Sequence, residues 1–315
     1  MADLTEFHDE LRAVAREVLA KPGPVDIAAT GWCGLEVPSE LDGAGATFAE
    51  VAVILTELGR AAAQTSYLGS AVLGVGALLL LEQDALLRGI ANGTTAVAVA
   101  LEGTFRIEGS RLYGQASFVP DAAEAQHLLV ITDEGTAVVS DGLTVAPQPV
   151  LDQTRRLATV HADGVTIDET ARFADHHQTL RNRAAIAIAC DSLGISEAML
   201  DATVAYVATR EQFGRPVGSF QAVKHACADM LVKTTMSRTL IAEAIRNPTS
   251  VTASQAKSYV CAAAVDVAGT AMQLHGGIGY TWESGIHRYL KRATLNRSLF
   301  GSPAAHRRLL AQRYA

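Results

Sequence analysis

The stretch that decides the fold is Arg210-Glu-Gln-Phe213-Gly-Arg-Pro216, which is followed later in the chain by Gln273-Leu-His-Gly276-Gly277-Ile-Gly-Tyr280. The first stretch comes after a long helical pattern, with apolar residues at Ile186, Cys190, Leu193, Leu200, Val204 and Val207. The second ends another apolar pattern at a glycine pair, which accepts the left-handed backbone of a helix terminus. An arginine at one helix end and open backbone N–H groups at another are suited to binding phosphate.

Working outward, the pattern predicts a chain that is mainly α with a small β domain. Helical segments with short connections follow Thr179 and predict an antiparallel bundle. Ser219 and the pair Thr252 and Gln255 are predicted to cap two of its helices, and Pro303 suits the first turn of the last one. Short β-rich segments precede the bundle, and an apolar helical region precedes them. The predicted domains are an N-terminal helical domain, a middle β domain and a C-terminal bundle, at residues 1–91, 92–172 and 173–315.

Composition excludes several classes of function. The net charge is −7 and is spread without a run, which argues against nucleic acid or an anionic membrane as partner. The most apolar run, residues 71–81, is too short to span a bilayer and predicts a core helix. The N-terminus shows no signal-peptide pattern, and the four dispersed cysteines indicate reduced thiols, so a cytoplasmic protein is expected. The adjacent pair His176 and His177 does not face one ligand, and no metal site is predicted.

The two deciding stretches, with Phe220-Gln-Ala-Val-Lys-His225 after the first, resemble signature segments of the acyl-CoA dehydrogenase family. Residues 30–45 also resemble the N-terminal turn of that family. The resemblance is weak in the β domain, clear at residues 30–60 and strong at residues 180–300. It implies the acyl-CoA dehydrogenase fold, with an N-terminal helical domain, a middle antiparallel β domain and a C-terminal four-helix bundle.

In that family the two segments hold the ADP half of FAD across a subunit interface. By resemblance, the cofactor contacts in this chain are Arg210, Gln212, Phe213, Val217, Gln273, Leu274, Gly276 and Gly277. The residues alone leave simpler alternatives open. Arg210 could be a surface arginine paired with Glu211 or Asp201, and the glycines could form an ordinary helix C-cap. Trp282, taken alone, is expected in the core.

The catalytic carboxylate of the family is missing from both positions where the resemblance would place it. The usual position is occupied by Gly301, and the minority position, before an arginine on the long helix, is occupied by Asn182. Neither residue can accept a proton as a base. Glu102 and Glu283 are the candidates for a displaced base.

The β domain also departs from the family. Residues 99–105 and 116–120 replace the loops that hydrogen-bond the flavin ring, so the chain is not expected to build its own flavin-ring and acyl pocket. These departures resemble the shortened, base-less subunits of α2β2 acyl-CoA dehydrogenases in bacterial steroid breakdown. The resemblance implies FAD shared with a catalytic partner subunit, an acyl-CoA substrate and an electron-transfer flavoprotein as acceptor. Two alternatives stay open, namely a self-sufficient acyl-CoA dehydrogenase or oxidase with a displaced base, and a flavin-free helical interaction protein.

Overall fold

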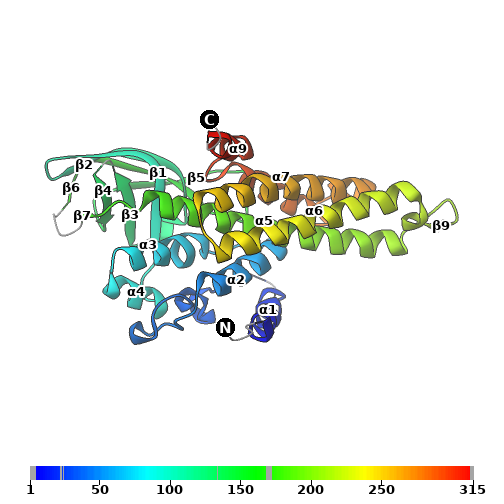
Figure 1. Cartoon of the computed structure of the whole chain (residues 1–315), viewed down its shortest axis with the longest axis horizontal. Coiled ribbons are helices and arrows are strands. Elements are labelled where there is room, and N and C mark those ends of the chain that lie inside the picture. Colours follow the sequence, from blue (N-terminus) through cyan, green and yellow to red (C-terminus); the bar gives the residue numbers. More distant parts are fainter. Residues whose placement is uncertain (1–4, 22, 24, 133, 168–171, 313–315) are drawn as a thin grey trace. The chain divides into compact units, whose positions relative to one another are not determined.

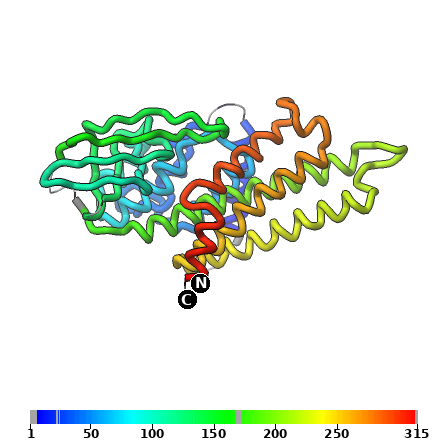
Figure 2. Tube along the Cα trace, turned by 90° about the horizontal axis from the view of Figure 1, so that it is seen from above, coloured from blue at the N-terminus to red at the C-terminus, as the bar shows by residue number. Residues whose placement is uncertain are grey.

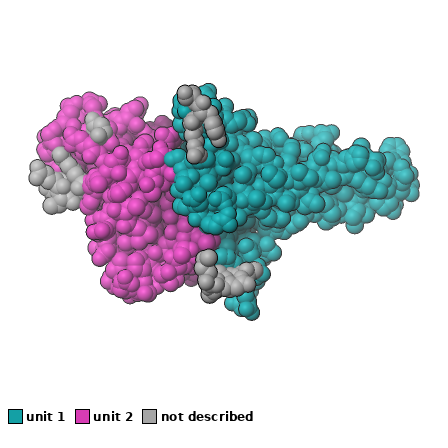
Figure 3. All heavy atoms as spheres, viewed as in Figure 1, with its two compact units in different colours: residues 1–22, 52–63, 185–315 teal, residues 23–51, 64–184 magenta. Residues whose placement is uncertain are grey.

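The computed structural model describes residues 5–21, 23, 25–132, 134–167 and 172–312. The chain divides into two compact units, one drawn from residues 1–22, 52–63 and 185–315 and the other from residues 23–51 and 64–184 (Figure 3). The bundle and the sheet thus fall in different units, and the N-terminal helices are divided between them. The three predicted domain ranges stay a prediction.

The unit of residues 23–51 and 64–184 is built on one sheet, whose described strands run in the order β5-β6-β2-β1-β3-β4-β7 (Figure 1). Neighbouring strands are antiparallel except β1 and β3, which are parallel. The strands are β1 (Val97–Glu108), β2 (Arg111–Pro120), β3 (His127–Thr132), β4 (Gly135–Val139), β5 (Thr144–Gln148), β6 (Leu157–Thr166) and β7 (Arg172–Phe173).

The helices of this unit bury the apolar run that the sequence assigned to a core helix. Residues 68–78 are all buried, first in a π-helical segment (Leu68–Gly74) and then in α3 (Val75–Leu80). A second short helix, α4 (Asp84–Ala91), leads into the sheet. Over the part of the chain that is described, no helix combines the length and the apolar character needed to cross a bilayer.

The other unit contains the helical bundle. Figures 1 and 2 show its long helices side by side. They are α5 (His177–Thr209), which enters the unit at residue 185, α6 (Gln221–Arg246), α7 (Ser250–Leu274) and α8 (Ile286–Ser298). The unit also contains α1 (Thr5–Leu19), α9 (Pro303–Gln312) and, from residue 52 on, α2 (Phe48–Arg60). Small side chains from α7, such as Ala264, Ala268 and Ala271, allow neighbouring helices to approach closely. The prediction of a mainly α chain with a small β domain and a four-helix bundle is confirmed.

Two of the three predicted helix starts are wrong in detail. The Thr249 side chain, not the pair Thr252 and Gln255, caps α7, because Thr249 and Thr252 form the reciprocal hydrogen bonds of a capping box. Ser219 lies in a 3-10 turn and does not cap α6, whose N-cap residue is Phe220. Pro303 begins α9 as predicted.

Two glycines fix the crossing of α2 and α5. A Cβ atom added to Gly194 would lie 1.9 Å from the carbonyl oxygen of Thr56, and one added to Gly59 would lie 2.0 Å from the carbonyl oxygen of Asp191. The two backbones are therefore in direct contact, and any side chain at either glycine would force them apart.

Candidate cofactor site

The first predicted segment forms a tight hairpin after the long helix α5. Glu211 pairs with Pro216 and Gln212 with Arg215, and the amide of Val217 donates to the Arg210 carbonyl at 2.7 Å. The two residues at the tip have positive φ, 54° at Phe213 and 71° at Gly214, as a type I′ turn requires.

The turn holds Phe213 in a left-handed backbone conformation. Positive φ is unfavourable for a residue as bulky as phenylalanine and is typical of sites where function opposes local stability. Its side chain is 91% exposed, so burial within this chain does not offset the cost. The hairpin thus presents an exposed aromatic ring, which meets the Phe220 ring edge-on at a centroid distance of 6.0 Å.

The second predicted segment begins where α7 ends at Leu274. A 3-10 turn (Gly276–Tyr280) follows, with φ of 62° at Gly276. A Cβ atom added to Gly276 or Gly277 would meet no heavy atom within 4 Å. These glycines therefore leave open backbone on the outer side of the turn, where an external group can approach. The Tyr280 hydroxyl donates to the exposed Gln273 side chain at 3.4 Å.

A ring stack brings the two segments to the same end of the bundle (Figure 1). The Tyr206 ring, in the last turn of α5, lies parallel to the His275 ring at a centroid distance of 4.4 Å. His275 is oriented by its own helix, because its Nδ1 donates to the Ala271 carbonyl at 2.7 Å. This stack places Arg210, at the end of α5, near the turn that carries Gly276 and Gly277.

The cations and aromatic rings at this end of the bundle are suited to binding a nucleoside diphosphate. Arg210 is exposed, and among the described residues it forms no ion pair. Among the described residues Arg210 pairs with neither of the two alternative partners, Glu211 and Asp201, and the Asp201 carboxylate pairs with Arg60 at 2.5 Å. The Arg215 guanidinium lies 4.1 Å from the Phe220 ring centroid, which fixes a second cation on the hairpin.

The expectation that Trp282 lies in the core is wrong, since its side chain is 71% exposed. The ammonium of Lys291 lies 4.8 Å from the Trp282 ring centroid, and the His287 ring meets it edge-on at 4.4 Å. With Tyr280, which is 64% exposed, the indole extends the aromatic surface of this end. A large apolar side chain such as that of tryptophan is usually buried. Its exposure here follows from the position of Trp282 just after the 3-10 turn.

The two positions predicted for the base are occupied by Gly301 and Asn182, and neither residue carries a carboxylate. Gly301 lies in the turn between α8 and α9 with φ of 94°. The Asn182 amide oxygen, on α5, accepts a hydrogen bond from Gln178 at 2.9 Å. Of the displaced-base candidates, Glu102 pairs with Arg181 at 3.3 Å and Glu283 is exposed.

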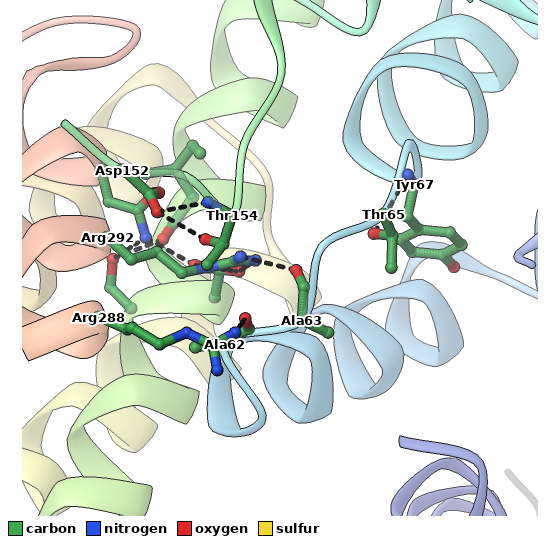
Figure 4. Close-up of polar contacts among 12 residues, drawn as sticks. Ala62, Ala63, Thr65, Tyr67, Asp152, Thr154, Arg288 and Arg292 are labelled. Carbon is green, nitrogen blue, oxygen red and sulfur yellow. Dashed lines mark hydrogen bonds and ion pairs between the residues drawn. The ribbon is translucent and has the colours of Figure 1, made fainter. Parts of the chain in front are cut away.

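A buried polar network that the sequence analysis did not predict positions α8. The Arg292 guanidinium is 2% exposed and donates to both carboxylate oxygens of Asp191, with the shortest contact at 2.6 Å. It also donates to the Ala63 carbonyl at 2.8 Å, and Arg288 donates to the neighbouring Ala62 carbonyl (Figure 4). These donors satisfy carbonyls just beyond the end of α2. In the sequence, the one feature that could have indicated this network is Asp191, an acidic residue in an otherwise apolar helical stretch.

A second buried carboxylate lies in the other unit. Asp121 is 7% exposed and accepts a hydrogen bond from the Gly69 amide at 2.8 Å. Burial raises the pKa of its carboxyl group to about 7, although that hydrogen bond and the nearby Arg155 oppose the shift. Within the described ranges, no group of three or more His, Cys, Asp or Glu residues is arranged to hold a metal ion.

Comparison with known proteins assigns the family. The model of the acyl-CoA dehydrogenase C-terminal domain matches residues 177–315, and that of the N-terminal domain matches residues 5–83. The acyl-CoA dehydrogenase IpdE2 of Mycolicibacterium smegmatis is 36% identical over 89% of this chain and 83% of its own length. This chain belongs to the acyl-CoA dehydrogenase family, a family of FAD-dependent oxidoreductases that act on CH–CH bonds.

Solved structures share the fold of this chain. A variant of the Tcur3481–Tcur3483 steroid ACAD is 26% identical and superposes with a TM-score of 0.87 over 98% of each chain. The ChsE4–ChsE5 complex from Mycobacterium tuberculosis has a TM-score of 0.89 at 24% identity, covering 98% of this chain and 97% of the other. The acyl-CoA dehydrogenase fold predicted from the sequence is confirmed.

Proposed function

We propose that this chain is the flavin-completing subunit of an FAD-dependent acyl-CoA dehydrogenase and that a catalytic partner subunit supplies the base. Two similar proteins favour this arrangement. The ChsE4–ChsE5 protein is a complex, and the Tcur3481–Tcur3483 protein is a steroid ACAD. The proposed substrate is therefore a CoA thioester, with a steroid-derived acyl group as the favoured class. The proposed assembly is an α2β2 heterotetramer with an electron-transfer flavoprotein as electron acceptor.

The proposed contribution of this chain is the ADP-binding half of the FAD site. Arg210 offers a forked cation to the pyrophosphate, and the open backbone at Gly276 and Gly277 can approach the nucleotide closely. The remaining proposed contacts come from the same two segments, at Gln212, Phe213, Val217, Gln273 and Leu274. The observation that carries the proposal is the Tyr206–His275 stack, because it gathers both segments at one end of the bundle.

The division of chemistry follows from the residues at the two base positions. Dehydrogenation of an acyl-CoA removes an α-proton with a base, and FAD, when bound, would supply the acceptor for the hydride that leaves Cβ. Gly301 has no side chain to accept that proton, and the amide of Asn182 is not basic. Proton removal is therefore assigned to the partner subunit, and this chain binds and orients the cofactor.

The direct test is the replacement Arg210→Ala in the complex of this chain with its catalytic partner. Losing a charge-assisted hydrogen bond of about 1.5–3 kcal/mol predicts FAD binding that is roughly 10- to 100-fold weaker. Arg246→Ala is the matched control, because Arg246 is an exposed arginine at the opposite end of α6 from the hairpin. FAD affinity is measured by titrating the apo complex and following the flavin fluorescence.

Two results would contradict the proposal. Unchanged FAD affinity in the Arg210→Ala complex would remove this arginine from the site. Absence of flavin from every complex that contains the wild-type chain would favour a helical interaction protein instead.

A further inference from the structure

Trp282 is a large aromatic side chain that the protein holds in place at its surface. The indole is 71% exposed, although tryptophan is highly buried on average. The Lys291 ammonium lies 4.8 Å from the centroid of the indole, and the His287 ring meets it at 71° with a centroid distance of 4.4 Å. His287 and Lys291 are four residues apart on α8, so both approach the indole from one face of that helix. These contacts orient the ring and leave most of its surface open to solvent.

The surroundings of the indole suit a flat aromatic group that carries phosphate. Lys291 supplies a positive charge beside the ring, and Trp282 follows the same 3-10 turn that carries the open backbone of Gly276 and Gly277. Exposed aromatic rings bind nucleobases by stacking, whereas cations and open backbone N–H groups bind phosphate. The exposed carboxylate of Glu283, next to the indole, adds an acceptor for an amino group or a ribose hydroxyl. An adenine nucleotide matches all of these groups.

We propose that Trp282 is the stacking surface for the adenine of an ADP-containing ligand and that Lys291 and His287 hold its ring in position. The proposal rests on the proposed function, which assigns an ADP group to this end of the bundle. It adds a residue outside the two segments that resemble the family. FAD and a CoA thioester both end in an ADP group, so the adenine comes from one of these two ligands.

The first arm of the test measures FAD binding by the complex of this chain with its catalytic partner. If FAD supplies the adenine, Trp282→Ala should weaken FAD binding roughly 5- to 100-fold, as the loss of one base–aromatic stack does. Trp282→Phe keeps a flat ring and should recover most of that affinity. Phe7→Ala removes another exposed aromatic side chain, on α1, and is the matched control with unchanged affinity. Because the indole is exposed, Trp282→Ala should change the melting temperature of the chain by less than about 2 °C.

The second arm uses the complex saturated with FAD and the probe 3′-phosphoadenosine 5′-diphosphate, which is the nucleotide end of CoA. Titration calorimetry measures its affinity for the wild-type complex and the same three variants. If CoA supplies the adenine, Trp282→Ala should weaken binding of the probe by a similar factor and leave FAD affinity unchanged. Trp282→Phe should again recover most of the loss.

Three results would overturn the proposal. The first is unchanged affinity for both ligands in the Trp282→Ala complex. The second is a loss in Trp282→Phe as large as that in Trp282→Ala, because a stacking surface needs only a flat ring. The third is dissociation of the Trp282→Ala complex, which would assign the indole to a contact with the partner subunit. Failure of the proposed FAD site gives a different result, since Arg210→Ala would then leave FAD affinity unchanged.

Discussion

The crossing of α2 and α5 gives the sharpest stability prediction, for the replacement Gly194→Ala. The new Cβ atom would lie 1.9 Å from the Thr56 carbonyl oxygen, and reaching the 3.4 Å of ordinary contact means separating the helices by about 1.5 Å. Overpacking of this kind costs about 1–3 kcal/mol. The separation would also strain the Arg292 side chain, which bridges Asp191 on α5 and the Ala63 carbonyl after α2.

The net effect follows from comparing these costs with the gain in helix propensity. Alanine is favoured over glycine by about 1 kcal/mol in a helix, whereas a weakened buried charged hydrogen bond costs about 1.5–3 kcal/mol. Gly194→Ala is therefore expected to destabilise the chain by about 2–4 kcal/mol, which lowers the melting temperature by roughly 5–10 °C.

The matched control is Gly269→Ala, on α7. This glycine is also in a helix, but an added Cβ atom meets no heavy atom within 4 Å. The propensity gain should then appear alone, as a small stabilisation of at most about 1 kcal/mol. Thermal unfolding followed by circular dichroism compares the two variants with the wild type. A Gly194→Ala protein as stable as the wild type, or an equal loss in both variants, would refute the close crossing of the helices.

Three further predictions concern single side chains. Asp121→Asn should remove one contribution to the pH dependence of stability. The pKa of the folded carboxyl group is raised to about 7 from its ordinary value of 3.8, so this group's contribution to the free energy of unfolding should fall by up to about 4 kcal/mol as pH rises through that window. The difference in free energy of unfolding between wild type and variant, measured by denaturation at several pH values, should show that fall. Lys257→Met should lower the free energy of unfolding, measured in urea, by about 1–3 kcal/mol, because the buried carbonyls of Asn296 and Gly301 lose their hydrogen-bond donor. Lys233→Met removes only the surface ion pair with Asp266 and should lower it by less than about 1 kcal/mol. Phe213→Asn should raise the melting temperature slightly, because asparagine tolerates the positive φ, while weakening FAD binding by the complex; unchanged FAD affinity would exclude a role for this ring.

The sequence predicted the bundle because its apolar residues recur at helical spacing over long segments, as from Ile186 to Val207. It also placed the first turn of α9 at Pro303, where local backbone chemistry decides the outcome. The pairing of the strands was harder to predict from the sequence. The strand β2 interrupts its apolar alternation with Gly114, and the parallel pairing of β1 with β3 joins residues that no local pattern connects.

The features of the site that the sequence could not predict depend on contacts between distant residues. The Tyr206–His275 stack and the position of Lys257 beneath the Gly301 turn each join separate helices. Trp282 was expected in the core because a tryptophan at the start of a helix is more often buried, yet it follows a 3-10 turn at the end of the bundle and is exposed. The assignment of individual FAD contacts stays a prediction, because it came from the resemblance of the two segments to the family.

The most direct measurement is the FAD content of this chain purified alone and purified with its catalytic partner, followed by anaerobic titration of each sample with an acyl-CoA. We expect the chain alone to be colourless and inert, and the complex to carry one FAD for each pair of unlike subunits and to bleach on titration. A chain that by itself retains one FAD per polypeptide and bleaches with the thioester would contradict a subunit that completes the cofactor site and leaves proton removal to its partner.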